Sequence, residues 1–341
     1  MLSFTNDDIE KLKHYIDKSN SCALLSHYNP DGDSLGSCVA LFSYLKDKNK
    51  DVYVIIPNEY PAFLDFILKD VCFCVARKHL DKAKEVLEKS DLIISLDHND
   101  FKRTGDDIKE CFENLKSTKI LIDHHPNPNK EAYDLIFSET SSSSTCEVLY
   151  EVLYALEKSN KFLSPKIVDA LYVGLCTDTG SFSYACNNKR TYEVAGTLVE
   201  NGVNVEVMHH KLYNTFTESH LRLLGFCLMY RLRVFNKKGA AFIYLTKEDL
   251  AKFRYKVGDL EGVVNYCLMI KGITFGALIT ERPDRIRISF RSSSDTFNVN
   301  SFAREHWNGG GHPKAAGGHC FEDLDYVIEK ITKQIETFPN V

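Results

Sequence analysis

Short apolar runs alternate with helical patterns over the first two-thirds of the chain, and this alternation constrains the fold more than any other feature. Four runs are expected to form buried strands: Cys22–Ser26, Val52–Pro57, Leu92–Leu96 and Ile120–Ile122. Between them, apolar residues recur at helical spacing over Ser37–Lys46 and Leu80–Lys89. Strands that alternate with helices indicate βαβ units, so we predict a largely parallel sheet flanked by helices.

A second and smaller domain is expected towards the C-terminus, because 341 residues exceed the size of an average single domain. The pattern predicts three strands and a closing helix there, at Ala240–Leu245, Ile273–Ile279, Ile286–Phe290 and Leu324–Glu336. Val205–Arg231 is expected to be one long helical connector. We therefore predict an α/β domain over residues 1–204, a helical linker over 205–230 and an α+β domain over 231–341.

The composition argues against some classes of protein. The formal net charge is −5, whereas a protein that coats long nucleic acid needs clustered Lys and Arg. A short anionic substrate is compatible with this charge, since bound metal ions can supply local positive charge. The chain has eleven Cys without CxxC pairs, and it has neither a signal-peptide pattern nor an apolar run long enough to cross a membrane. These features predict a cytoplasmic protein with reduced thiols and no membrane partner.

Acidic and histidine side chains follow the ends of several apolar runs. They lie after the first predicted strand (His27, Asp31, Asp33), the third (Asp97), the fourth (Asp123, His124, His125) and the apolar run Ala170–Cys176 (Asp178). In an open α/β sheet, ligands bind beyond the carboxyl ends of the strands, so we expect these side chains to meet in one crevice. Carboxylates combined with imidazoles suit Mn²⁺, Fe²⁺ or Co²⁺ better than Ca²⁺. The sequence therefore favours a metal site there.

Each motif also has a simpler interpretation when it is considered alone. Asn29–Asp33 contains the residues that are most frequent in polar turns. Asp97 and Asp178 could each cap the N-terminus of a helix, and the adjacent histidines could mark a solvated strand end. Two adjacent histidines at the end of a buried strand are hard to explain by packing, and the combination of the motifs favours a metal site over these alternatives.

The order of the motifs resembles that of the DHH phosphoesterase superfamily: HxxxDxD, then a single Asp, then DHH, then an Asp in the segment TDTGSF. Asn308–Gly317, with the sequence NGGGHPKAAG, is similar to the GGGH signature of the DHHA1 domain that accompanies the DHH domain. The resemblance spans nearly the whole chain. It implies a DHH catalytic domain, a helical linker and a DHHA1 substrate-binding domain, in that order.

The resemblance also implies a site for two divalent ions, for which Mn²⁺ is the usual metal. The implied ligands are His27 and Asp31 for one ion, Asp33, His124 and Asp178 for the other, and Asp97 as a bridge between both. Asp123 would orient a ligand imidazole without binding an ion itself. A hydroxide activated between the two ions would then attack the phosphorus.

Further residues are expected to act on the substrate. His125 cannot easily share an ion with His124, since adjacent strand residues point to opposite faces, and the resemblance places it at the scissile phosphate. There it would act with Asp97 as a catalytic residue and protonate or hydrogen-bond the leaving oxygen; a purely structural histidine is the alternative. The other implied substrate-binding residues are Gly310, Gly311 and His312 in the glycine-rich segment, Arg291 at a predicted strand end and, with less support, Arg190.

Together with these features, the resemblance implies a metal-dependent phosphodiesterase that cleaves cyclic di-AMP or short linear nucleotides such as pApA to mononucleotides. The alternatives within the family are a phosphatase of 3′,5′-bisphosphate nucleotide (pAp) and an exonuclease of nanoRNA. An inorganic pyrophosphatase shares the DHH half but has a different C-terminal domain, and a non-catalytic nucleotide-binding module should have lost a metal ligand. The expected partner is therefore a small nucleotide, and a homodimer is compatible with the sequence.

Overall fold

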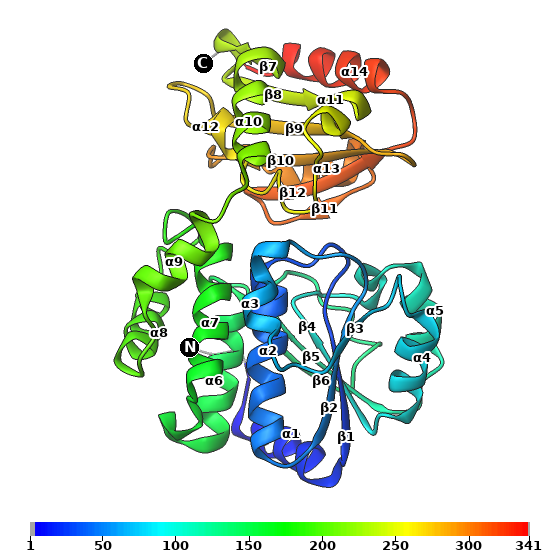
Figure 1. Cartoon of the computed structure of the whole chain (residues 1–341), viewed down its shortest axis with the longest axis vertical. Helices are drawn as coiled ribbons and strands as arrows, with labels where there is room; N and C mark the ends of the chain where they lie inside the picture. The colour runs from blue at the N-terminus through cyan, green and yellow to red at the C-terminus, as the bar shows by residue number, and fades with distance from the viewer. Residues whose placement is uncertain (1–3, 340–341) are drawn as a thin grey trace. The chain divides into compact units, whose positions relative to one another are not determined.

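Six parallel strands form the central sheet of the N-terminal unit, Met1–Thr215, in the computed structural model, which describes residues 4–339 (Figure 1). The strand order is β3-β2-β1-β4-β5-β6, and each neighbouring pair is parallel. The bounds are β1 Ser21–Leu25, β2 Asp51–Ile56, β3 Phe73–Val75, β4 Leu92–Leu96, β5 Thr118–Asp123 and β6 Leu135–Ser138. The predicted parallel sheet is confirmed, and the four predicted strands correspond to β1, β2, β4 and β5.

Helices cover both faces of this sheet. The helices of this unit are α1 Asn6–Lys18, α2 Gly32–Asp47, α3 Asp65–Leu68, α4 Leu80–Lys89, α5 Asp106–Glu113, α6 Thr145–Glu157, α7 Pro165–Asp178, α8 Lys189–Glu200 and α9 Val205–Tyr213. Figure 1 shows α2, α6 and α7 on one face and α4 and α5 on the other. Within β1, Leu24 packs in the core on the α2 side, whereas Ala23 and Leu25 pack in the core with α4 and α5. Because both faces are buried, the central strands are continuous apolar runs rather than alternating patterns.

The C-terminal unit, Phe216–Val341, is an α+β structure with its own mixed sheet, as predicted. The strand order is β11-β12-β10-β9-β8-β7, and β8 and β9 are the parallel pair. The bounds are β7 Leu232–Phe235, β8 Ala240–Leu245, β9 Phe275–Glu281, β10 Ile286–Ser292, β11 Gly310–Gly311 and β12 Ala315–Cys320, with helices α10 Glu218–Phe226, α11 Lys247–Lys252, α12 Asn265–Leu268, α13 Val299–His306 and α14 Leu324–Glu336. Trp307, Phe242 and Phe290 are fully buried in the core that this sheet forms with α13 and α14.

The prediction of one long helix over the connector is wrong. The chain forms α9 and α10, which are separated by residues 214–217, and a π-helical turn at Cys227–Arg231 follows. The break arises because Thr217 caps α10, its side chain accepting a hydrogen bond from the backbone N–H of His220. The division between the two units falls in this break, after Thr215. That residues 205–230 act as a linker stays a prediction.

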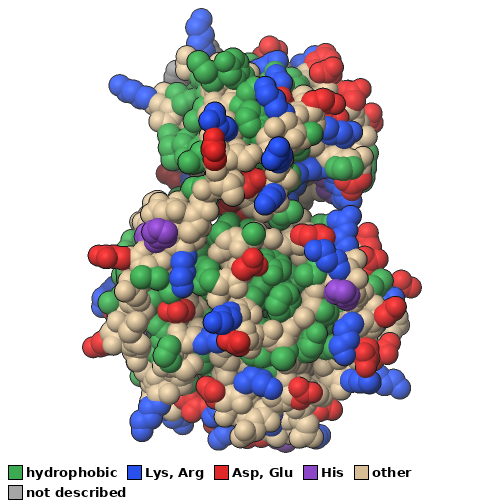
Figure 2. All heavy atoms as spheres, viewed as in Figure 1, with side chains coloured by type: hydrophobic (Ala, Val, Ile, Leu, Met, Phe, Trp, Pro, Cys, Tyr) green, Lys and Arg blue, Asp and Glu red, His purple; other side chains and the backbone are tan. Residues whose placement is uncertain are grey.

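On the face shown in Figure 2, basic and acidic side chains are interspersed, and no continuous basic stripe is visible there. Among residues 4–339, no helix combines the length and the apolar character that are needed to cross a bilayer.

Candidate metal centre

The predicted site residues of the N-terminal unit gather at the carboxyl edge of its sheet. β1 and β4 are neighbours at the point where the strand order reverses, which is where ligands bind in open α/β sheets. His27 follows β1, Asp97 follows β4, and His124 follows β5. The loop after β1 leads into α2, whose first turn contains Asp33. Asp178 is the last residue of α7 and reaches the same place from a helix rather than from a strand.

The first group of side chains consists of His27, Asp31 and Asp97. The Nε2 atom of His27 lies 3.3 Å from Oδ2 of Asp97 and 3.7 Å from Oδ2 of Asp31. The Nδ1 atom of the same ring lies 2.9 Å from the backbone oxygen of Tyr28, which fixes the orientation of the imidazole. His27 and Asp97 are buried, and Asp31 is half-buried.

The second group consists of Asp33, His124 and Asp178. The Nε2 atom of His124 lies 3.4 Å from Oδ2 of Asp178 and 4.0 Å from Oδ2 of Asp33. It also lies 3.6 Å from Oδ1 of Asp97. Asp97 therefore directs one oxygen to each group, which is the geometry expected of a bridging carboxylate. Its backbone has a φ of 65°, a left-handed conformation that is uncommon for a residue with a side chain and is often found at functional sites.

Helix capping does not compete with metal binding at these carboxylates. Asp31 caps α2 with Oδ1, which accepts hydrogen bonds from the N–H groups of Asp33 and Ser34, while its Oδ2 faces His27. Asp97 and Asp178 do not cap helix N-termini, because Asp178 ends α7 and Asp97 directly follows β4. The simpler reading of the loop as a turn is thus compatible with the metal site.

Two glycines allow α2 and α7 to approach closely beside the second group. A Cβ atom at Gly32 would lie 2.5 Å from the side chain of Thr177. At Gly174 it would lie 2.2 Å from Sγ of Cys146 and 2.7 Å from Oδ1 of Asp33. A side chain at either position would therefore displace the residues that surround Asp33.

The N-terminus of α6 holds Asp33, and the sequence interpretation missed this contact. The N–H groups of Thr145 and Cys146 donate to Oδ2 and Oδ1 of Asp33, at 2.6 and 2.9 Å. Ser144 caps the helix by accepting a hydrogen bond from the N–H of Glu147. Ser144 and Glu147 match the S-x-x-E signature of a helix start, which could have located this helix.

His125 differs from its expected geometry. β5 ends at Asp123, so strand alternation does not apply to the two histidines, and their ring centroids lie only 4.7 Å apart. The expectation that they point to opposite faces is therefore wrong. Asp123 is fully buried, and its Oδ1 lies 2.7 Å from Nδ1 of His125. The imidazole that Asp123 orients is thus that of His125, not that of the predicted ligand His124.

The charges of the cluster strongly perturb its titration. Burial alone would lower the pKa of His27, but the hydrogen bonds and charges of Asp31 and Asp97 outweigh it and raise the pKa to about 10. Burial opposes protonation of His124 too, yet the surrounding carboxylates raise its pKa to about 9. Burial, followed by the charge of Asp97, raises the pKa of Asp33 to about 8.

The donor set fits divalent metal ions. Burial, together with the repulsion between carboxylates that lie this close, raises the pKa of both Asp33 and Asp97. Cations at the two groups would offset it, and mixed imidazole and carboxylate oxygen donors suit first-row divalent ions. The acid and histidine cluster can therefore bind divalent metal ions.

In the metal-free protein, the free energy of unfolding should fall as pH rises from about 6.5 to 9. Over this range the folded state binds more protons than the unfolded state, because His27, His124 and Asp33 all have raised pKa values. Each extra proton lowers the stability by about 1.4 kcal/mol per pH unit. Urea unfolding of chelator-treated protein at several pH values measures this slope, and a stability that rises with pH would contradict it.

The binding of metal ions should show the opposite pH trend, because ligands must lose their protons before they bind. Affinity for Mn²⁺ should increase with pH, and binding near pH 7 should release protons. Calorimetric titrations in buffers of different ionisation enthalpy count these protons. Binding without any proton release would mean that these side chains are not the ligands.

Arg190 has carboxylate partners of its own. Its Nε donates to Oε1 of the buried Glu151, and its Nη1 donates to Oε2 of Glu193 at 3.1 Å. These contacts raise the pKa of the guanidinium further above its ordinary value. They favour a structural ion pair over the predicted contact with substrate.

The other predicted substrate-binding residues lie in the C-terminal unit. Gly310 and Gly311 form β11, and the backbones of His312 and Ala315 exchange hydrogen bonds of 2.7 and 3.2 Å in the turn that leads to β12. Arg291 of β10 is directly opposite Ala315. The structure thus brings Arg291 beside the glycine-rich segment, and contact of either with a substrate stays a prediction.

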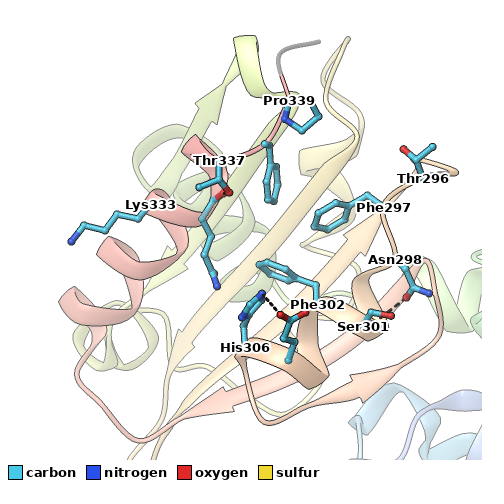
Figure 3. Close-up of a pocket in the computed structure, with 12 residues that line it drawn as sticks. Thr296, Phe297, Asn298, Ser301, Phe302, His306, Lys333, Thr337 and Pro339 are labelled. Carbon is cyan, nitrogen blue, oxygen red and sulfur yellow. Dashed lines mark hydrogen bonds and ion pairs between the residues drawn. The ribbon is translucent and has the colours of Figure 1, made fainter.

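The C-terminal unit contains a cavity of about 700 Å³ between α13, α14 and the loop that precedes α13 (Figure 3). Phe297, Phe302 and Phe338 line it together with polar side chains such as His306 and Gln334. These rings pack against the core of the unit. None of the predicted site residues lines this cavity.

Comparison with known proteins identifies the class to which this fold and cluster belong. The model of the DHH family N-terminal domain matches residues 21–175, and that of the DHHA1 domain matches residues 239–337. The chain belongs to the DHH/DHHA1 family.

Three known proteins are similar to this chain over different shares of their length. The bifunctional oligoribonuclease and PAP phosphatase NrnA of Bacillus subtilis is 27% identical over 89% of this chain and 90% of its own. A solved exopolyphosphatase-related protein from Bacteroides fragilis is 32% identical, with a TM-score of 0.90 over 98% of this chain and 97% of that chain. The cyclic-di-AMP phosphodiesterase GdpP of B. subtilis is 24% identical over 62% of this chain and only 32% of its own.

Proposed function

We propose that the protein is a metal-dependent hydrolase of short linear oligoribonucleotides and of 3′,5′-bisphosphate nucleotide. The observation that carries the proposal is the buried cluster in which Asp97 lies between two groups of acid and histidine ligands. The substrate class is supported by NrnA, whose similarity extends over nearly the whole of both chains. The similarity to GdpP covers a smaller part of each chain. We therefore favour the alternative from the sequence, a pAp phosphatase or nanoRNA exonuclease, over a hydrolase of cyclic di-AMP.

We propose His27 and Asp31 as ligands of one ion, Asp33, His124 and Asp178 as ligands of the other, and Asp97 as the bridge. Two divalent ions, most simply Mn²⁺, would acidify a shared water and offset negative charge on the phosphoryl oxygens. Hydrogen bonds from the protein would hold the ligand carboxylates in the orientation that the ions require.

His125 completes the proposed site from the protein side. Asp123 is within hydrogen-bonding distance of its Nδ1, so the opposite ring nitrogen, Nε2, would meet the substrate. From there the imidazole would donate a hydrogen bond or a proton to the leaving oxygen. Arg291 and His312 would bind substrate phosphate, as the resemblance implies.

A cleavage panel with Mn²⁺ tests the substrate class. It comprises an RNA dinucleotide, pApA, adenosine 3′,5′-bisphosphate (pAp), cyclic di-AMP and pyrophosphate. The Asp97→Asn variant is the control for contaminating enzymes. We expect the linear dinucleotides and the bisphosphate nucleotide to be hydrolysed faster than cyclic di-AMP. Turnover restricted to cyclic di-AMP or to pyrophosphate would reject the proposed substrate class.

A further inference from the structure

Thr145 donates hydrogen bonds to two carboxylates of the cluster, those of Asp33 and Asp97. Its backbone N–H donates to Oδ2 of Asp33 at 2.6 Å, and its side-chain hydroxyl donates to Oδ1 of Asp97 at 2.9 Å. Thr145 is fully buried. It lies 112 residues from Asp33 and 48 residues from Asp97, so the contact is made by the fold and not by a local motif.

The two contacts of Thr145 differ in what they require of the sequence. The N–H that binds Asp33 is present in every residue except proline, whereas the hydroxyl that binds Asp97 requires Thr or Ser at this position. Oδ1 of Asp97 is the oxygen that faces His124, at 3.6 Å. The hydroxyl therefore fixes the rotation of the carboxylate that lies between the two groups.

A hydrogen-bond network holds the first turn of α6, and with it Thr145, in place. The buried carboxylate of Glu147 accepts hydrogen bonds from the N–H and the hydroxyl of Ser143, at 3.1 and 2.6 Å. It also accepts one from the hydroxyl of Thr191 in α8, at 2.7 Å. The helix start is thus tied to a second helix, and Thr145 cannot shift without breaking these bonds.

We infer that Thr145 is a positioning residue for the metal centre, which holds Asp97 in the orientation that lets one carboxylate serve both ions. The inference rests on the proposed metal-dependent function and extends it to a residue outside the proposed set of ligands. Without the hydroxyl, Oδ1 of Asp97 loses the hydrogen bond that orients it beside His124, and the affinity for the pair of ions falls.

Calorimetric titration of metal-free protein with Mn²⁺ tests this role directly. Thr145→Val replaces the hydroxyl with a methyl group of similar size and keeps the N–H. We expect its affinity for Mn²⁺ to fall by about 10- to 100-fold, the usual cost of losing a residue that orients a metal ligand. Thr145→Ser keeps the donor and should bind Mn²⁺ like the wild type. Thr332→Val, which removes a hydroxyl bonded to the backbone of Ile328 in the C-terminal unit, is the matched control and should also bind normally.

The outcomes separate this inference from the proposed function. If the wild type binds two ions and Thr145→Val binds them equally tightly, the positioning role is rejected and the metal centre stands. If Thr145→Ser loses as much affinity as Thr145→Val, packing of the methyl group matters instead of the hydroxyl, and the inference is again rejected. If the wild type binds no ions, the proposed function itself fails. Should Thr145→Val not fold, which circular dichroism reports, Thr145→Ala is titrated in its place against the same expectation.

Discussion

Replacing Asp97 with Asn should abolish hydrolysis. The amide keeps the size of the side chain and can still accept the hydrogen bond of Thr145, but it removes the negative charge between the two ligand groups. Metal-ion catalysis stabilises a transition state by several kcal/mol, so the rate should fall by about a thousandfold or more. Steady-state rates and the number of Mn²⁺ ions bound per chain, measured together, test this expectation.

Asp91 provides the matched control, because it precedes β4 just as Asp97 follows it. Asp91 lies at the opposite end of the strand, where its carboxylate accepts hydrogen bonds from the N–H groups of Asn20 and Ser21. Asp91→Asn can reduce stability but should retain the bound ions and the rate. A fully active Asp97→Asn variant would show that this carboxylate does not bridge the ions.

Replacing His125 with Ala should lower kcat by about 10²- to 10⁴-fold, the usual contribution of a general acid or base. The ion content should not change, because the proposed ligand histidines are His27 and His124. Asp123→Asn should have a smaller effect in the same direction, since it leaves the imidazole present but no longer holds it by a charged hydrogen bond. Rates at saturating Mn²⁺, together with ion counts, separate a catalytic role from ligand binding. Loss of an ion in His125→Ala would make this histidine a ligand instead.

The central strands could be predicted from the sequence because burial on both faces makes them continuous apolar runs. The edge strands β3 and β6 were missed, since they are short and only partly buried. α6 was missed for a different reason. All of its residues from Thr145 to Leu153 are buried, so the helix has no polar face and no amphipathic period to detect.

The positions of the candidate ligands in the sequence could be predicted because each follows the end of an apolar run. Their detailed geometry could not be predicted. Strand alternation gave the wrong orientation for His124 and His125 because the strand ends one residue earlier. The contacts of Asp33 with α6 use backbone N–H groups, which have no signature in the sequence.

Anomalous diffraction from crystals grown with Mn²⁺ is the most direct test of the proposed two-ion centre. We predict two peaks about 3.5 to 4 Å apart at the carboxyl edge of the N-terminal sheet, with one oxygen of Asp97 at each peak. The absence of metal from this cluster, or ions bound only elsewhere on the chain, would contradict the account.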